Sequence, residues 1–272
     1  MNGILKRKEF LNKISVLDLQ KMSDLPIFFD EKKMDLEFRG DFQFIKKSER
    51  SLEEMRPYLS PYGKCPEGTK NPNAAKGPDP VYRVWRRAHL KQDDKKIKAV
   101  GLRYDLTLIP PGKIGDEFVK TAGHYHLPYP EAYEVLLGQA YFLIQSESAV
   151  FLVEAGPGEK FIIPPGFGHN TINVFNEPLL MANWISEKAE YDYEPYKNLH
   201  GASYYFLKNN DLIDIIKNPN YDSFPEIKKI RTREYSEFGI FKNLPLYSLV
   251  NTLDKLKFLN HPEEFKGEWR NW

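Results

Sequence analysis

Short runs of apolar and β-branched residues dominate the middle of the chain, between residues 81 and 217. Glycine, proline, asparagine and glutamate separate these runs, and no helical repeat intervenes. Many short strands without helices between them favour a β-sandwich or a β-barrel. The runs are VYRVWRR, KAVGLRYDLTLI, EFVKT, AYEVLLGQAYFLIQ, AVFLVEA, EKFIIP, HNTINVF and PLLMANWI. The pattern therefore predicts a mainly β fold.

The first 78 residues show a mixed pattern. Residues 34–45, MDLEFRGDFQFI, alternate as two strands joined at a glycine turn. The next segment is typical of a helix, because Ser51 and Glu54 have the spacing of a capping box. Residues 60–80 are rich in proline, glycine, asparagine and lysine, which predicts a long loop. A short amphipathic helix near the N-terminus is predicted from the spacing of Phe10, Leu11, Ile14, Leu17 and Leu19.

Apolar residues recur at helical spacing near the end of the chain. They predict a C-terminal helix that packs on the barrel or on a partner subunit. These residues are Leu244, Leu246, Leu249, Val250, Leu253 and Leu256. We thus expect a mixed N-terminal extension with a long loop over 1–78, a barrel over 79–221 and a helical C-terminal extension over 222–272.

Composition narrows the class of protein. The chain has 272 residues and a net charge of +1, with basic residues spread along it, so nothing favours binding to nucleic acid or to a membrane surface. No stretch reaches the roughly 18 apolar residues of a membrane helix, and charges interrupt the N-terminal apolar runs, unlike in a signal peptide. The single cysteine, Cys65, excludes an intrachain disulfide and is expected to be a structural or exposed thiol. We expect a cytoplasmic protein.

Two histidines stand one residue apart in the segment TAGHYHLPYPEAYEVLLG, residues 121–138. Residues i and i+2 of a strand share a face, so His124 and His126 point the same way and can bind one metal ion. The prolines after them end the strand and turn the chain back. Glu131 can then return to the histidines, while Glu134 is expected to face outward.

A third histidine, His169, begins a strand in GEKFIIPPGFGHNTIN. Three imidazoles and one carboxylate suit Fe²⁺, Mn²⁺, Ni²⁺ or Zn²⁺. Four protein ligands on a six-coordinate ion leave positions open for a substrate, as catalytic sites require. The other three histidines are expected to be structural or exposed.

The spacing of these residues matches two known signatures. The first run reads HxH, four residues, Glu, six residues and Gly; the second reads Gly, five residues, PxG, two residues, His, three residues and Asn. Both resemble the signature motifs of the cupin superfamily, with one departure at Phe118, where the first motif usually starts with glycine. The resemblance implies a double-sheet jelly-roll barrel, which agrees with the strand pattern.

One strand carries polar side chains that, in the lumen of a barrel, would suit a polar ligand. On the strand at 103–107, Arg103, Asp105 and Thr107 share one face. Thr121 and Gly123 lie beside the metal histidines, and a hydroxyl with the uncovered backbone N–H of a glycine is a common way to bind phosphate.

The segments LTLIPPGKIGDEFVKTAGHYH, EAYEVLLG and PPGFGHNTIN resemble the cupin-type phosphoglucose isomerases, over about residues 36–221. The resemblance implies a glycolytic and gluconeogenic enzyme that interconverts glucose 6-phosphate and fructose 6-phosphate. Carried over by position, it implies metal ligation by His124, His126, Glu131 and His169, with one ion per chain and Fe²⁺ favoured. It also implies phosphate contacts from Thr107, Thr121, Gly123 and Tyr82, and a sugar contact from Tyr133.

Charge suggests how such a site would act. A divalent ion at the C1 and C2 oxygens would stabilise a developing enediolate. Glu131 is the candidate base for the proton that moves between C1 and C2, with Tyr133 beside it. A metal-assisted hydride shift would need no base, and the sequence leaves both mechanisms open.

One side of the pocket departs from the family pattern. Ile185 and Tyr191 stand where a tyrosine and a histidine facing the sugar are expected, which leaves the identity of the sugar undecided. Two alternatives remain: another metal cupin enzyme, such as a dioxygenase or a different sugar-phosphate isomerase, and a sugar-phosphate-binding cupin without catalysis. Cupins commonly pair through their sheets, so a homodimer is expected.

Overall fold

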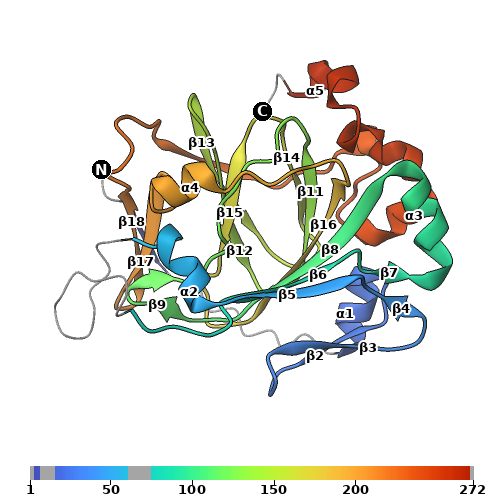
Figure 1. Ribbon diagram of the computed structural model, residues 1–272, viewed down its shortest axis with the longest axis horizontal. Helices are drawn as coiled ribbons and strands as arrows, with labels where there is room; N and C mark the ends of the chain where they lie inside the picture. The colour runs from blue at the N-terminus through green and yellow to red at the C-terminus, as the bar shows by residue number, and fades with distance from the viewer. Residues whose placement is uncertain (1–2, 7–15, 61–74, 270–272) are drawn as a thin grey trace.

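The computed structural model describes residues 3–6, 16–60 and 75–269. The expectations for Phe10, Leu11, Ile14 and Cys65, and for most of the 60–80 loop, fall outside these residues. Figure 1 shows a β-barrel at the centre of the molecule, with the C-terminal segment (red) and α3 (Asp94–Val100) gathered at one end.

The largest sheet carries much of the candidate site. Its order is β14-β11-β16-β8-β6-β5, and every pair of neighbours is antiparallel. Its strands are β5 (Lys46–Arg50), β6 (Tyr82–Arg86), β8 (Leu102–Ile109), β11 (Glu131–Leu137), β14 (Lys160–Ile163) and β16 (Leu179–Ser186).

Two further sheets complete the barrel. One has the order β15-β12-β13-β19 and the other β1-β18-β17-β10-β9. Their strands are β1 (Gly3–Lys6), β9 (Lys113–Ile114), β10 (Glu117–Phe118), β12 (Ala140–Ser146), β13 (Ala149–Ala155), β15 (Gly168–Ile172), β17 (Tyr204–Asn209), β18 (Leu212–Lys217) and β19 (Ile227–Arg231). The predicted mainly β jelly roll is confirmed.

The inner faces of these sheets form one apolar core. Phe142 and Phe161, from the facing strands β12 and β14, are buried with ring centroids 4.1 Å apart, and Tyr133 stacks on Phe161 at 5.4 Å. The alternation predicted for the strand at 103–107 is confirmed, because Tyr104, Leu106 and Leu108 belong to a second core on the outer face of β8.

Two segments, one near each end of the chain, cover that outer face. Leu19 from α1 (Val16–Ser23) and Leu256 near the C-terminus are buried in the same core. The Trp184 indole donates to the carbonyl of Leu246 at 2.9 Å. The C-terminal segment therefore packs on the barrel of its own chain, one of the two arrangements expected.

In place of the expected C-terminal α-helix, the structure has a series of short helices. These are the 3-10 helices η5 (Leu246–Asn251), η6 (Leu253–Leu259) and η7 (Pro262–Phe265), followed by α5 (Lys266–Trp269). Thr252, at φ −142° and ψ 52°, leaves helical conformation between the first two. Leucines at positions 253, 256 and 259 recur every three residues, a spacing that lines up in a 3-10 helix.

The N-terminal expectations are partly corrected. Residues 34–45 contain β3 (Asp35–Phe38) and β4 (Phe42–Gln43), but these pair with β2 (Ile27–Asp30) and β7 (His89–Leu90) rather than with each other. The capping box is confirmed: Ser51 caps α2 (Leu52–Met55), and Glu54 accepts from the Ser51 backbone N–H at 2.8 Å. This helix gives way after one turn to η1 (Arg56–Tyr58), which contains a proline.

Short helices also interrupt the strand-rich region, contrary to the expectation of none. Besides α3, these are η3 (Lys91–Asp93) and α4 (Glu194–Asn198); η4 (Ser236–Phe238) follows later. Among the described residues, no helix is long and apolar enough to cross a membrane.

Candidate metal centre and active site

His124 and His169 lie opposite each other on neighbouring backbone segments. The His124 N–H donates to the carbonyl of His169 at 3.2 Å, and the His169 N–H donates to the carbonyl of His124 at 3.0 Å. Their ring centroids are 4.6 Å apart. The two halves of the predicted ligand set are therefore joined by the backbone itself.

A tight turn brings His126 and Glu131 together. The Tyr129 N–H donates to the carbonyl of His126 at 2.8 Å, and the chain re-enters the sheet as β11 at Glu131. Nδ1 of His126 lies 2.6 Å from the carbonyl of Tyr129, and Nδ1 of His124 lies 3.3 Å from that of Ala122. Such contacts fix the ring and leave Nε2 for a metal.

The ligand atoms of His124, His126, Glu131 and His169 all lie within 4.8 Å of one another. Glu131 Oε2 is 2.9 Å from His126 Nε2 and 3.4 Å from His169 Nε2. Nε2 of His124 is buried and has no hydrogen-bond partner among the described residues. Because an unpartnered buried nitrogen is costly, this atom fits a site completed by a metal ion. The donor set suits a divalent transition metal.

Burial favours the neutral imidazole, the form that binds metals. Burial, with a smaller contribution from His126, lowers the pKa of His124 to about 3. Burial and the two neighbouring histidines hold the pKa of His169 well below its usual value. Burial is the largest single effect on His126 and lowers its pKa, but the hydrogen bond to Glu131, the charge of Glu131 and backbone hydrogen bonds together outweigh burial, so the pKa of His126 is raised.

Three of the four ligands, His124, Glu131 and His169, line the same pocket. The residues predicted to contact substrate are mostly in the same pocket: its walls include Tyr82, Thr107, Thr121 and Tyr133. The Tyr133 hydroxyl lies 3.1 Å from Nε2 of His169. The Thr121 side chain accepts a hydrogen bond from the Thr171 N–H at 2.9 Å.

Gly123 is not among the residues that line this pocket. A Cβ at this position would lie 2.0 Å from Cδ1 of Tyr196, far inside contact distance. The glycine is therefore required by close packing against a buried ring, whether or not its N–H binds phosphate.

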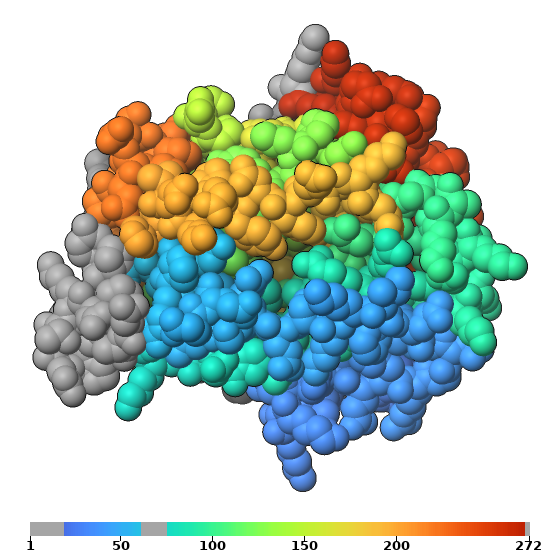
Figure 2. Space-filling view, viewed as in Figure 1, coloured from blue at the N-terminus to red at the C-terminus, as the bar shows by residue number. Residues whose placement is uncertain are grey.

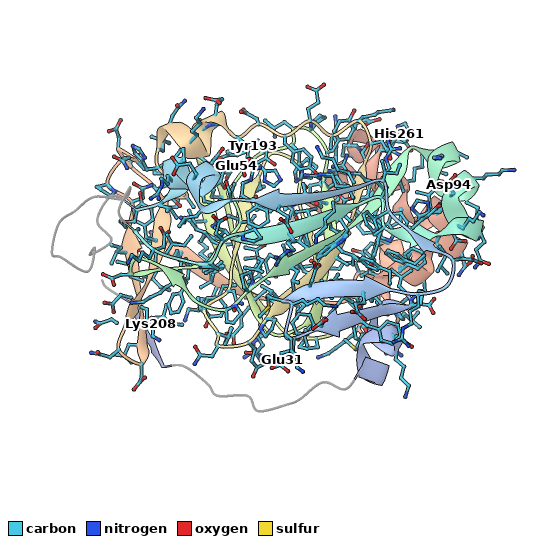
Figure 3. The ribbon with its side chains drawn as sticks, turned by 60° about the horizontal axis from the view of Figure 1, so that its bottom comes forward. Glu31, Glu54, Asp94, Tyr193, Lys208 and His261 are labelled. Carbon is cyan, nitrogen blue, oxygen red and sulfur yellow. The ribbon has the colours of Figure 1, made fainter. Side chains whose placement is uncertain are left out.

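The helices α2 and α4 flank this side of the barrel. Figure 2 shows the segment around residues 46–58 (light blue) beside the segment around residues 190–200 (orange). Glu54 and Tyr193, labelled in Figure 3, mark these two segments, and the Tyr193 ring is 6.4 Å from that of Tyr58. Tyr193 lines the pocket, so the segment around residues 190–200 borders it, and the segment around residues 46–58 contacts that segment through Tyr58.

Comparison with known proteins identifies the family. The family model described as "Glucose-6-phosphate isomerase (GPI)" matches residues 61–222. The glucose-6-phosphate isomerase of Thermococcus litoralis is 29% identical over 192 residues, covering 70% of this chain and 94% of that protein. The enzyme of the same name from Thermococcus kodakarensis is 30% identical over 146 residues, covering 53% of this chain and 74% of that protein.

The chain belongs to the cupin-type glucose-6-phosphate isomerase family. The predicted family and enzyme class are thereby confirmed. Among solved structures, an oxalate oxidase is 17% identical with a TM-score of 0.34, covering 42% of this chain and 56% of that chain. That similarity is too distant to inform the chemistry.

Ile185 and Tyr191, the two positions at which a departure from the glucose-6-phosphate isomerase family pattern is expected from the sequence, have different environments. Ile185 is fully buried in β16, paired in register with Glu131 on one side and Arg103 on the other. Tyr191 lines the pocket, with its ring centroid 4.7 Å from that of His124. Of these two residues, Tyr191 therefore faces the pocket and Ile185 does not.

Sequence reasoning missed several residues of this isomerase-family pocket. Arg86, Met181, Asn183 and Tyr193 line it, and none was singled out. Strand alternation could have found Arg86, because Tyr82, Val84 and Arg86 share one face of β6.

Glu134 points away from the metal site, as expected, but it does not reach solvent. It is 1% exposed, because the C-terminal segment covers it. Its carboxylate accepts from the Leu246 N–H at 2.7 Å and pairs with Lys160 at 2.8 Å. Burial raises the pKa of Glu134 to about 7, although Lys160 and the Leu246 N–H act against this shift.

Proposed function

We propose that this protein interconverts glucose 6-phosphate and fructose 6-phosphate with one divalent metal ion held by His124, His126, Glu131 and His169. The observation that supports it most is the convergence of these four side chains on the buried, unpartnered Nε2 of His124 in a glucose-6-phosphate isomerase family member. We favour Fe²⁺, with Mn²⁺, Ni²⁺ and Zn²⁺ as alternatives of suitable ligand preference. When bound, such an ion supplies positive charge that stabilises negative charge on neighbouring sugar oxygens.

The substrate phosphate would bind at the end of the pocket that holds Thr107 and Tyr82. Along β8, Thr107 lies four residues beyond Arg103, which is in register with Glu131 through Ile185. Tyr82 lies four residues before Arg86 on β6. The hydroxyls of Thr107, Thr121 and Tyr82 can donate to phosphate oxygens, and the backbone N–H of Gly123 is a further candidate.

The reacting carbons would then lie near Glu131 and Tyr133. Glu131 is the candidate base that removes the proton from C2 of the aldose and returns it to C1. Its Oε2 lies between two imidazoles in the structure, so this role requires the carboxylate to loosen from them when the sugar binds. The Tyr133 hydroxyl would orient the sugar chain. A direct hydrogen shift between the two carbons would leave Glu131 a metal ligand only.

A coupled assay tests the function. Purified protein is treated with chelator and then reloaded separately with Fe²⁺, Mn²⁺, Ni²⁺ or Zn²⁺, and conversion of fructose 6-phosphate to glucose 6-phosphate is followed with mannose 6-phosphate as a second substrate. We expect activity that disappears with the metal and returns on reloading. Oxygen uptake with a small organic acid would favour a dioxygenase, and tight binding of fructose 6-phosphate without turnover would favour a binding protein. The expected homodimer is checked by the mass measured in solution.

A further inference from the structure

Arg86 is a cationic side chain of the pocket to which neither the metal site nor the phosphate site assigns a role. Its Nη1 donates to Oδ2 of Asp105 at 3.2 Å and to the Tyr191 hydroxyl at 3.3 Å. Within the described part of the chain, its guanidinium makes no other hydrogen bond. The side chain is 31% exposed and lines the pocket, so its remaining N–H groups are available to a ligand.

Neighbouring side chains hold this guanidinium in place. Asp105 accepts from the Arg87 backbone N–H at 2.9 Å through Oδ1, and from Nε of Arg103 at 3.0 Å through Oδ2. Arg103 also donates to the Tyr191 hydroxyl. Arg103 and Asp105 are 11% and 3% exposed, so within this cluster they form the buried support and Arg86 the accessible cation.

The charges of this cluster do not balance. Two guanidinium groups, Arg86 and Arg103, face one carboxylate, Asp105, in a poorly hydrated environment. The nearest further carboxylate of the pocket, Glu131, is the proposed metal ligand. A surplus positive charge beside a pocket favours a ligand that carries or develops negative charge.

Strand register places Arg86 at the metal end of the pocket. Asp105, its partner, is in register with Asn183, which is in register with Tyr133. Tyr133 contacts His169, one of the four ligand residues. Tyr82, at the proposed phosphate end, is four residues away on β6, about 13 Å along an extended strand. Thr107, another proposed phosphate contact, pairs with Val84, two residues or about 7 Å along the strand from Arg86. Arg86 is thus in the row of Tyr133 and the reacting carbons rather than in the row of Thr107.

We propose that Arg86 donates hydrogen bonds to the sugar oxygens at the C1–C2 end, where negative charge develops during isomerisation. This inference rests on the proposed function. As the aldose loses its C2 proton, the electron pair moves toward the C1 oxygen; a proton then adds to C1, and the O2 proton moves to O1. Composition and redox state are unchanged overall. Arg86 transfers no proton, because its guanidinium stays charged. It stabilises the anion that exists after C2 has lost its proton and before C1 has gained one. Asp105 and Tyr191 are positioning residues.

Arg86→Gln, Arg86→Lys and the control Arg87→Gln test this role in metal-loaded protein. Arg87 is adjacent in sequence, pairs with Glu187 and does not line the pocket. Besides kcat and KM, binding is measured for inorganic phosphate, fructose 6-phosphate and a five-carbon aldonate 5-phosphate, whose carboxylate imitates the anion. We expect Arg86→Gln to lower kcat about 100-fold and to weaken aldonate phosphate binding at least about tenfold. Arg86→Lys should fall between, and the control should stay near wild type.

Each result bears on the inference. Phosphate binding and metal content should be unchanged in Arg86→Gln; an equal loss for inorganic phosphate would place Arg86 at the phosphate and overturn the inference. Wild-type kcat and aldonate affinity in Arg86→Gln would also overturn it. If Arg86→Gln does not fold, the test rests on Arg86→Lys. A wild-type kcat in Arg86→Lys would show that the hydrogen bonds of a guanidinium are not required, and would overturn the inference. Wild-type protein that neither converts nor binds fructose 6-phosphate would instead contradict the proposed function.

Discussion

Glu131 and Glu134 leave the same strand, β11, on opposite faces and are both almost fully buried. Glu131 reaches two histidines inside the barrel, whereas Glu134 reaches Lys160 and the backbone of the C-terminal segment outside it. The two carboxylates are three residues apart on one strand. Because they lie on opposite faces of the sheet, Glu131 has partners suited to chemistry, whereas Glu134 has partners that stabilise the fold.

Replacing Glu131 with Gln tests the proposed base. Gln keeps the shape but cannot accept a proton, so we expect at least about a 100-fold loss of kcat and no exchange of substrate hydrogen with solvent. Turnover of fructose 6-phosphate in deuterated water, followed by NMR, measures the exchange, and metal analysis shows whether the variant still binds its ion. Wild-type activity in a metal-loaded variant would remove Glu131 from the proton path.

Loss of His124 should abolish metal binding while leaving the fold intact. Its Nε2 has no hydrogen-bond partner among the described residues, so His124→Ala removes no hydrogen bond made by that atom. A bound ion stabilises only the folded state, so added Fe²⁺ or Mn²⁺ should raise the Tm of the wild type but not of the variant.

The matched control is His200→Ala, at an exposed histidine that belongs to neither group of possible metal ligands among the described residues. This control should keep the metal-dependent rise in Tm. A rise of wild-type size in His124→Ala would show that the ion binds elsewhere.

The parts of the site that could be predicted from sequence depend on local geometry. His124 and His126 share a face because they are two residues apart on an extended segment, and the prolines between them and Glu131 turn the chain back. Likewise, the inward face of β8 follows from simple alternation. These relations span a few residues, so the pattern of residue types is enough to predict them.

The missed features depend on contacts between distant segments. Arg86, Asp105 and Tyr191 meet from three separate parts of the chain, joined by hydrogen bonds that span 19 and 105 residues. Glu134 is covered by a backbone N–H that lies 112 residues away in sequence. Neither spacing nor composition carries that information. The first cluster arises only when β6, β8 and the segment after β16 come together, and the cover over Glu134 only when the C-terminal segment packs on the sheet.

Substituting Gly123 with Ala separates packing from phosphate binding. Because the new Cβ would lie 2.0 Å from the Tyr196 ring, we expect a loss of roughly 1–3 kcal/mol in the free energy of unfolding, measured with urea. Gly267→Ala is the control, since nothing lies within 4 Å of a Cβ there. A Gly123→Ala protein of normal stability with weakened phosphate binding would instead assign the glycine to the ligand.

Glu134 should make folding stability depend on pH near neutrality. Burial raises its pKa from 4.5 to about 7, so the folded protein binds this proton more tightly than the unfolded chain does. The contribution of this group to stability is fully present below pH 4.5 and is lost as the pH rises to about 7, by at most about 3 kcal/mol.

The measurement compares wild type with Glu134→Gln by urea unfolding between pH 5 and 8. Gln does not titrate, and any constant cost of the substitution cancels because only the change with pH is read. We expect the stability of the wild type, relative to the variant, to decrease as the pH rises. A difference that stays flat would mean that Lys160 and the Leu246 N–H keep Glu134 ionised throughout this range, and that the buried pair is an ion pair at every pH examined.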